Sequence, residues 1–171
     1  RVNEASGIDL EVLPGEDEAR LTFLAVRRWF GWSAGRLGVF DIGGGSLELA
    51  VGADESPDVA VSLPLGAGRL TRERVDRGDD PDDIRRAVRR EIGAVAGPLV
   101  RHGGFDRAVA TSKTFRSLAR MCGAAPRGDG PYVRRELTLR DLQRLNRELR
   151  TLSVERIARL PGVSITRAHQ M

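Results

Sequence analysis

The sequence predicts one globular α/β domain, and three observations support this prediction. Its 171 residues suit a single domain. Hydrophobic residues at 40% and charged residues at 30% exclude a disordered or collagen-like chain. Extended segments dominate the first half, and helical and extended segments alternate after them, which is typical of α/β proteins. No apolar run approaches the roughly 18 residues of a membrane-spanning helix, so we expect no membrane segment.

The first part of the chain predicts a short strand over 8–13 and a helix over 16–30. Pro14 and Gly15 separate the two, and three acidic residues in the first helical turn favour the positive end of the helix dipole. Apolar side chains at helical spacings form a broad face on this helix. We therefore expect it to be well buried, with Trp29 in the core or at an interface.

Three strands are expected next, over 37–42, 47–51 and 59–65. The first two are separated by three consecutive glycines and a serine. A helix follows, with Asp80 as its cap and Pro81 at its first position. Apolar residues recur along this helix at spacings of three and four, which predicts a single buried stripe. The stripe consists of Ile84, Val88, Ile92, Val95 and Leu99.

The last part predicts a short strand and three helices separated by loops. The spacing of Thr138 and Asp141 has the form of a capping box and marks the start of the second of these helices. The loop before it, over 123–131, is rich in glycine and proline. The strand is expected over 107–110, the first helix over 111–121 and the last helix over 153–160.

The formal net charge of +4 hides an uneven distribution along the chain. Residues 1–60 carry 11 acidic and 5 basic side chains, whereas residues 61–171 carry 13 acidic and 23 basic ones. All the basic residues except Lys113 are arginines. This bias has two interpretations that composition cannot separate, a GC-rich coding sequence or a surface that faces a polyanion. The arginines at 85, 86, 89 and 90 lie away from the apolar stripe and are expected to face solvent.

Cys122 is the only cysteine in the sequence. A single thiol excludes an internal disulfide framework and a cysteine zinc site, so we expect a reducing, cytoplasmic location. The side chain is expected to be a small buried apolar group rather than a nucleophile.

The strongest chemical signal is the segment Asp41-Ile-Gly-Gly-Gly-Ser46, where an apolar strand ends near an acid and turns on three glycines. Glycines allow backbone N–H groups to approach an anion closely, Asp41 is suited to a hydrated divalent metal, and Ser46 can donate to a phosphate oxygen. The segment is not a Walker loop, because it lacks Gly-Lys-Thr and a strand follows it. An ordinary glycine-rich hairpin is the alternative, but three consecutive glycines exceed what a hairpin needs.

Two weaker signals accompany this segment. Ser112, Lys113 and Thr114 lie where a strand runs into a helix, so that N–H groups, hydroxyls and positive charge gather in a place suited to an anion. Plain helix capping is the alternative interpretation. Glu18 belongs to the acidic first turn of the first helix, where carboxylates usually complement the dipole, but it is also placed to act as a general base on water.

Together these motifs resemble the exopolyphosphatase and guanosine pentaphosphate phosphohydrolase (Ppx/GppA) family, within the actin-like and sugar-kinase-like superfamily. The resemblance runs nearly end to end. It is carried by Gly15-Glu-Asp-Glu18-Ala-Arg20, Asp41-Ile-Gly-Gly-Gly-Ser-Leu-Glu48, Leu63-Pro-Leu-Gly66-Ala-Gly-Arg69-Leu70, Thr111-Ser-Lys-Thr114 and the stretch from Glu155 to Ala168.

The resemblance implies a ribonuclease-H-like fold, a mixed sheet with flanking helices, in a protein of two similar lobes with the active site between them. It implies hydrolysis of terminal phosphates of inorganic polyphosphate or of guanosine pentaphosphate with Mg²⁺. By position, Glu18 resembles the glutamate that activates water, and Asp41 and Glu48 resemble the acids around the metal. The phosphate-binding residues implied are Gly43, Gly44, Gly45, Ser46, Ser112, Lys113 and Thr114.

Some features of the chain depart from the family. The Asp-Xaa-Gly-Ser-Asn-Ser motif that begins the first lobe is missing, so the resemblance implies that residues 1–171 form one domain, a second lobe truncated at both ends. We expect this isolated lobe to be inactive or nearly so. Lys113 stands where many relatives carry a glycine, and it would either bind an extra phosphate or narrow the site.

Other functions remain as alternatives. A non-catalytic sensor of polyphosphate or nucleotide with the same fold is the main one, and the arginine-rich second half motivates it. A kinase or ATPase of the superfamily would need an adenosine pocket, which no segment indicates. A specific nucleic-acid partner is not expected, because aromatic residues make up only 5% of the chain. The sequence leaves open the preferred substrate and whether the parent protein is a homodimer.

Overall fold

The computed structural model describes residues 7, 12–101, 103–164 and 168. The strand expected over 8–13 falls mostly outside the described residues. Two short 3₁₀ turns lie at Trp32–Ala34 and Arg127–Asp129, and a π-helical turn lies at Thr71–Val75. The main elements are α2 (Gly15–Phe30), β1 (Leu37–Ile42), β2 (Leu47–Gly52), β3 (Val59–Leu63), α3 (Ala67–Leu70), α4 (Pro81–Arg101), β4 (Arg107–Ala110), α5 (Ser112–Met121), α6 (Leu139–Leu149) and α7 (Val154–Ile157).

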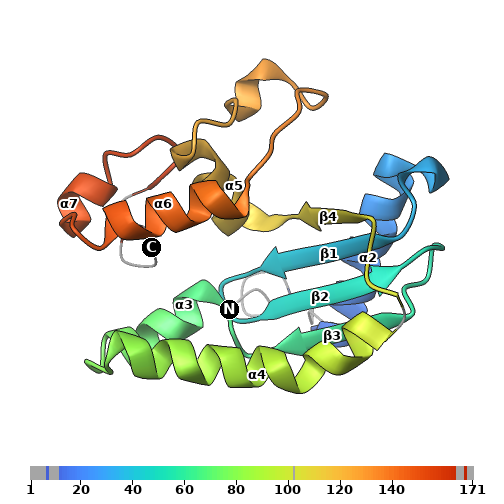
Figure 1. Cartoon of the computed structure of the whole chain (residues 1–171), viewed down its shortest axis with the longest axis horizontal. Helices are drawn as coiled ribbons and strands as arrows, with labels where there is room; N and C mark the ends of the chain where they lie inside the picture. The colour runs from blue at the N-terminus through green and yellow to red at the C-terminus, as the bar shows by residue number, and fades with distance from the viewer. Residues whose placement is uncertain (1–6, 8–11, 102, 165–167, 169–171) are drawn as a thin grey trace.

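The four strands form one mixed sheet in the order β3-β2-β1-β4 (Figure 1). The strands β1, β2 and β3 pair antiparallel as a meander, and β4 returns to lie parallel to β1. The crossover between β3 and β4 runs through α4, since parallel strands cannot be joined by a tight turn. The carboxyl ends of β1 and β4 therefore meet at the same edge of the sheet, where the glycine-rich turn and the start of α5 follow them.

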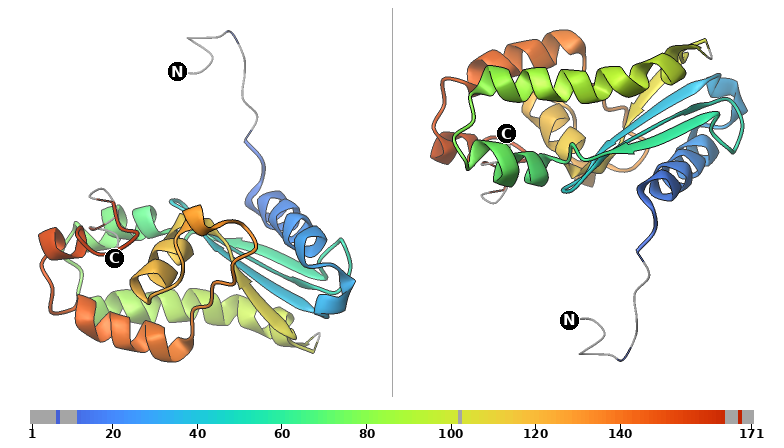
Figure 2. Two further views of the ribbon diagram at one scale, coloured as in Figure 1. Left: turned by 90° about the horizontal axis from the view of Figure 1, so that it is seen from above. Right: turned by 90° about the horizontal axis from the view of Figure 1, so that it is seen from below.

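Helices cover both faces of the sheet, with α2 on one side and α4 on the other (Figure 2). On the α2 face, the buried core contains Ala19, Phe23, Val26, Leu37, Val39, Ala50 and Ala60. On the opposite face, the buried core contains Leu47, Leu49, Leu63 and Leu65, with Val88, Val95 and Leu99 of α4 packed against it. Alternate residues of each strand point to opposite faces, so each strand contributes to both cores.

Arg27 is buried completely within the α2 core. Its guanidinium donates to three backbone carbonyls, those of Gly31 at 3.0 Å, Gly35 at 2.7 Å and Gly52 at 3.2 Å. A buried cation is costly unless its donors are used. Arg27 therefore ties the carboxyl end of α2 to the turn before β1 and to the end of β2.

The expected elements are largely confirmed, and the differences have local causes. The strand expected to reach residue 65 ends at Leu63, because Pro64 has no N–H for the ladder. The helix expected over 153–160 is helical only over Val154–Ile157. On α2, the predicted broad buried face is narrower, since Leu21 is 53% and Trp29 57% exposed. Ile92, expected in the buried stripe of α4, is also exposed.

Both predicted helix caps are confirmed. The Thr138 hydroxyl accepts a hydrogen bond from the Asp141 N–H at 3.1 Å, and the Asp80 carboxylate accepts one from the Asp82 N–H at 2.8 Å. Across the part of the chain that the structure describes, no helix combines the length and apolar character needed to cross a bilayer.

Candidate functional site

The glycine-rich turn over 43–46 is held by hydrogen bonds from two directions. Within the turn, the Gly43 N–H donates to the Ser46 carbonyl at 2.9 Å. From α3, the N–H of Ala67 donates to the Gly43 carbonyl at 3.0 Å, and the N–H of Arg69 donates to the Gly44 carbonyl at 2.8 Å. These bonds engage three carbonyl oxygens of the turn and so connect it to α3.

Gly66 allows the first turn of α3 to approach the glycine-rich turn. A Cβ at residue 66 would lie 2.3 Å from the Gly45 carbonyl carbon and 2.4 Å from the Ser46 nitrogen. No side chain fits there without a backbone shift. Gly44 and Gly45 differ, because a Cβ at either would meet nothing within 4 Å and both residues are exposed. The turn therefore presents open backbone on its outer side, as a phosphate-binding loop requires.

Four polar side chains form a row across the α2 face of the sheet, which we call the polar row: Ser62, Glu48, Asp41 and Thr111. Asp41 of β1 is directly opposite Glu48 of β2, and Glu48 is opposite Ser62 of β3. Residues opposite each other in such pairs share a face and lie close together. The structure thus brings together the two predicted metal-side acids.

Both carboxylates of the polar row accept a hydroxyl hydrogen bond. The Ser62 hydroxyl donates to Oε1 of Glu48 at 3.0 Å, and the Thr111 hydroxyl donates to Oδ2 of Asp41 at 2.5 Å. Glu48 is only 3% exposed, and a buried carboxylate needs such a donor. The sequence alone did not single out Ser62, and it placed Thr111 in the motif before α5 without a partner, because each bond depends on strand register rather than on local spacing.

Glu18 lies in the first turn of α2, next to the polar row. The backbone of Gly15 at the start of this helix touches Ser62, since a Cβ on Gly15 would be 2.4 Å from the Ser62 hydroxyl. Although Glu18 is an exposed residue, partial burial raises the pKa of its carboxyl above the ordinary value. The negative charges of Glu48 and Asp41 raise this pKa further. The Glu18 carboxyl thus lies within electrostatic reach of both predicted metal-side acids.

The start of α5 adjoins the polar row through Thr111. Ser112, the first residue of α5, has a φ of 75°, which is uncommon for a residue other than glycine. Its hydroxyl accepts a hydrogen bond from the Phe115 N–H at 3.3 Å. Lys113 is exposed and Thr114 is half-buried, and the structure shows no hydrogen bond from either side chain to the glycine-rich turn.

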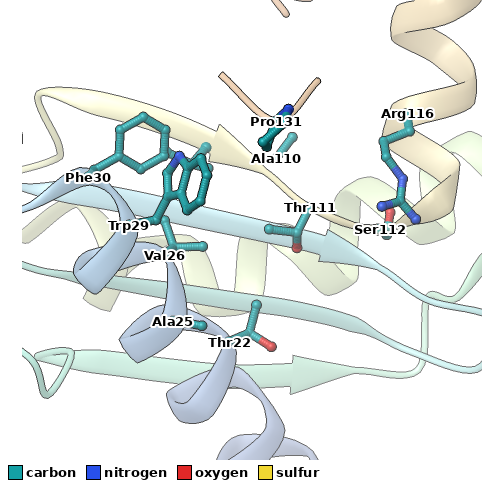
Figure 3. Close-up of a pocket in the computed structure, with 11 residues that line it drawn as sticks. Thr22, Ala25, Val26, Trp29, Phe30, Ala110, Thr111, Ser112, Arg116 and Pro131 are labelled. Carbon is teal, nitrogen blue, oxygen red and sulfur yellow. The ribbon is translucent and has the colours of Figure 1, made fainter. Parts of the chain in front are cut away.

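A pocket of about 550 Å³ extends along the sheet from the start of α5 (Figure 3). Its polar end contains Thr111, Ser112 and Arg116, and its apolar end contains Trp29 and Phe30 of α2. The side chain of Trp29 stacks on Tyr132, with ring centroids 5.6 Å apart. Trp29 therefore lines a surface pocket and is not a core residue.

Mg²⁺ is commonly bound by one or two carboxylates, with water and phosphate oxygens as its other ligands. The paired carboxylates of Asp41 and Glu48 fit this donor set. Within residues 7, 12–101, 103–164 and 168, no group of three or more His, Cys, Asp or Glu side chains lies together in a way that would hold a metal by itself.

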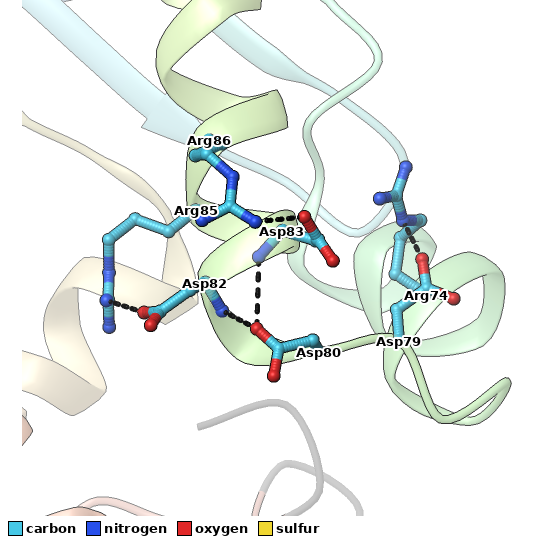
Figure 4. Close-up of polar contacts among 7 residues, drawn as sticks. All are labelled: Arg74, Asp79, Asp80, Asp82, Asp83, Arg85 and Arg86. Atoms are coloured by element: carbon cyan, nitrogen blue, oxygen red, sulfur yellow. Dashed lines mark hydrogen bonds and ion pairs between the residues drawn. The ribbon is translucent and has the colours of Figure 1, made fainter.

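The arginines at the start of α4 make surface ion pairs (Figure 4). Arg85 pairs with Asp82 and Arg86 with Asp83, each one helical turn away. This confirms that the start of α4 is a solvated face. Cys122 is half-buried, and burial raises the pKa of its thiol, which disfavours the reactive thiolate.

Comparisons with known proteins agree with the resemblance. The model of the Ppx/GppA phosphatase family matches residues 1–171. Exopolyphosphatase 1 of Mycobacterium leprae is 52% identical over 177 residues, which cover 100% of this chain and 52% of that protein. A solved exopolyphosphatase from Cytophaga hutchinsonii has a TM-score of 0.75 at 24% identity, and the Aquifex aeolicus PPX-GPPA enzyme has 0.69 at 26%. Each match covers 99% of this chain and 56% of the solved chain.

The structural matches confirm the predicted fold class, a ribonuclease-H-like α/β fold with a mixed sheet and flanking helices. The chain spans about half the length of the relatives it matches.

Proposed function

The chain belongs to the Ppx/GppA phosphatase family, and we propose that it supplies one wall of a site that hydrolyses the terminal phosphoanhydride bonds of inorganic polyphosphate. The observation that carries this proposal is the position of the polar row. The row crosses the sheet where β1 ends, next to the glycine-rich turn, and Glu18 lies beside it. A carboxylate pair, an open glycine backbone and a separate base are the parts that phosphoryl transfer to water needs.

In the proposed reaction, a water molecule attacks the terminal phosphorus, and the bond from that phosphorus to its bridging oxygen breaks. Glu18 accepts a proton from the water, and its raised pKa makes it a stronger base than an ordinary glutamate. The N–H groups of Gly44 and Gly45 and the Ser46 hydroxyl bind the terminal phosphate. The products are orthophosphate and a polyphosphate shortened by one unit.

A metal ion and phosphate contacts from the start of α5 complete the proposed site. Mg²⁺ held by Asp41 and Glu48 would neutralise charge on the phosphate oxygens. Ser112, Lys113 and Thr114 would bind phosphates from the start of α5, where the helix dipole and the lysine favour negative charge. Guanosine pentaphosphate is a second substrate of the same chemistry, since it also ends in a phosphoanhydride-linked phosphate.

We propose that this chain is the second of two lobes and that the site lies between them. The protein that contains both is called the two-lobed protein below. Because one wall of the site is then missing from residues 1–171, the 171-residue chain alone is expected to show little or no turnover. A non-catalytic polyphosphate sensor is the second candidate, and the excess of 23 basic over 13 acidic side chains in residues 61–171 favours it.

Phosphate release from long-chain polyphosphate tests the proposal. The two-lobed protein is compared with its Glu18→Gln variant in the presence of Mg²⁺, and we expect a loss of at least about 100-fold in kcat. Glu16→Gln is the matched control, because Glu16 lies in the same helical turn and is also exposed. Unchanged turnover in Glu18→Gln would contradict the assigned role, and tight binding of polyphosphate without hydrolysis by the wild type would favour the sensor.

A further inference from the structure

We propose that Thr111 is a positioning residue for the site, because its hydroxyl fixes the orientation of the Asp41 carboxylate. This inference rests on the proposed function, which places Asp41 beside the metal and phosphate. Thr111 itself touches neither the reacting water nor the phosphate in this proposal. It acts through Asp41.

The backbone places the two side chains next to each other. The parallel register of β1 and β4 ends with Phe40 opposite Ala110, and the N–H of Thr111 then donates to the Phe40 carbonyl at 2.9 Å. This bond extends the ladder by one residue and puts Thr111 beside Asp41 on the α2 face. The proximity is therefore built into the sheet and is not a property of one side-chain rotamer.

The Thr111 hydroxyl does not perform its usual local role. Thr111 is the N-cap residue of α5, where a threonine hydroxyl normally accepts a hydrogen bond from an N–H in the first turn. It makes no such bond here, and the Ser112 hydroxyl accepts from the Phe115 N–H instead. The positive φ of Ser112 accompanies this exchange of roles. The Thr111 hydroxyl donates to Asp41 Oδ2 at 2.5 Å.

The Asp41 carboxylate needs such a constraint because like charges surround it. Glu48 is directly opposite, and the charge of Asp41 also raises the pKa of Glu18. Charge-assisted hydrogen bonds to carboxylates are short and directional. The Thr111 bond engages Oδ2 only, and Oδ1 has no hydrogen-bond partner among the described residues. One oxygen is thus fixed toward β4, and the other is left for a ligand.

The test compares variants of the two-lobed protein that change the hydroxyl and little else. Thr111→Val keeps the shape and removes the donor, whereas Thr111→Ser keeps the donor. Thr151→Val is the matched control. The Thr151 hydroxyl also donates, to the Glu148 carbonyl at 2.8 Å, but Thr151 lies exposed in the turn after α6. The readouts are kcat and KM for polyphosphate hydrolysis, the melting temperature, and crystal structures of the wild type and Thr111→Val.

We expect Thr111→Val to lower kcat by about 10-fold to 100-fold with a smaller change in KM, as the loss of a hydrogen bond to a charged group predicts. The kcat of Thr111→Ser should stay within about 3-fold of the wild-type value, because the hydroxyl donor is kept. If Thr111→Val and Thr111→Ser lower kcat equally, loss of the threonine methyl group costs as much as loss of the hydroxyl, and the proposal is wrong. Wild-type kcat in Thr111→Val would also overturn it.

The crystal structures separate this inference from the proposed function. If the wild type does not hydrolyse polyphosphate, the proposed function fails. The position of the Asp41 carboxylate in the two crystal structures still tests whether the Thr111 hydroxyl fixes its orientation. We expect the Asp41 carboxylate to move or to occupy more than one conformer in Thr111→Val, and an unchanged position overturns the inference. If Thr111→Val does not fold, Thr111→Ala replaces it and is compared with Thr111→Ser, since these two variants differ only by the hydroxyl.

Discussion

The contact between Gly66 and the glycine-rich turn gives the sharpest test of how the site is built. In Gly66→Ala, the new Cβ would lie 2.3 Å from the Gly45 carbonyl carbon and 2.4 Å from the Ser46 nitrogen. These distances are roughly 1 Å shorter than van der Waals contact, and both partners are backbone atoms that cannot rotate away. The turn or α3 must therefore shift.

The cost follows from what that shift would break. Overpacking of this kind costs about 1–3 kcal/mol. The two hydrogen bonds from Ala67 and Arg69 to the turn would also weaken, at about 1 kcal/mol each. We therefore expect Gly66→Ala to lose about 3–5 kcal/mol of unfolding free energy. Urea unfolding followed by circular dichroism measures it, and wild-type stability would refute this reasoning.

Two other glycine-to-alanine variants make this experiment specific. In Gly44→Ala, the new Cβ meets nothing within 4 Å, so the free energy of unfolding should stay within about 0.5 kcal/mol of the wild-type value. Phosphate release should nevertheless fall, because the Cβ enters the proposed phosphate position. Gly93→Ala, in the exposed interior of α4, should gain about 0.5–1 kcal/mol and keep full turnover. A loss of stability in Gly44→Ala would contradict the open outer side of the turn.

Three further predictions concern charged residues. The pKa of Glu18 is raised in the folded protein, so folding favours the protonated form of this carboxyl. Glu18→Gln should therefore melt at a higher temperature than the wild type at pH 7 while losing turnover, and the two melting temperatures should become equal below the ordinary pKa of 4.5. A lower melting temperature of the variant at pH 7 would contradict the raised pKa. Glu48→Gln removes a negative neighbour, so carbon-13 NMR titration should find the pKa of Glu18 lower than in the wild type, and an unchanged pKa would contradict the coupling. Arg27→Met removes the side-chain donor of three backbone carbonyls, of which only that of Gly52 lies in a buried bond. At about 1 kcal/mol for each lost hydrogen bond, it should cost about 2–4 kcal/mol in urea unfolding, with kcat unchanged for the folded fraction. A loss under about 1 kcal/mol would contradict the role of Arg27.

Local patterns were sufficient to predict most elements and the glycine-rich turn. The alternation and length of β1 and β2, the capping residues Asp80 and Thr138, and the three glycines all act over a few residues. Their physical effects are local, so the sequence displays them directly. The acidic first turn of α2 left two interpretations of Glu18, a carboxylate that complements the dipole or a general base. The family resemblance favoured the general base, and this role stays a prediction.

Contacts between distant segments could not be predicted in the same way. Thr111 and Asp41 are 70 residues apart, and Ser62 and Glu48 are 14 apart, so each bond exists only because of the register of the sheet. The burial of Arg27 likewise depends on carbonyls from three separate positions. Neither an amphipathic pattern nor a residue spacing contains this information.

The chemical outcome of the proposed reaction is the most direct test of the function. Phosphorus-31 NMR of long-chain polyphosphate, incubated with the two-lobed protein and Mg²⁺, reports orthophosphate and chain ends as separate signals. Terminal hydrolysis predicts that orthophosphate accumulates while the number of chain ends stays constant, and that neither signal changes with Glu18→Gln. An increase in chain ends would indicate internal cleavage, and binding of polyphosphate without any orthophosphate would indicate a sensor; either result would contradict the account.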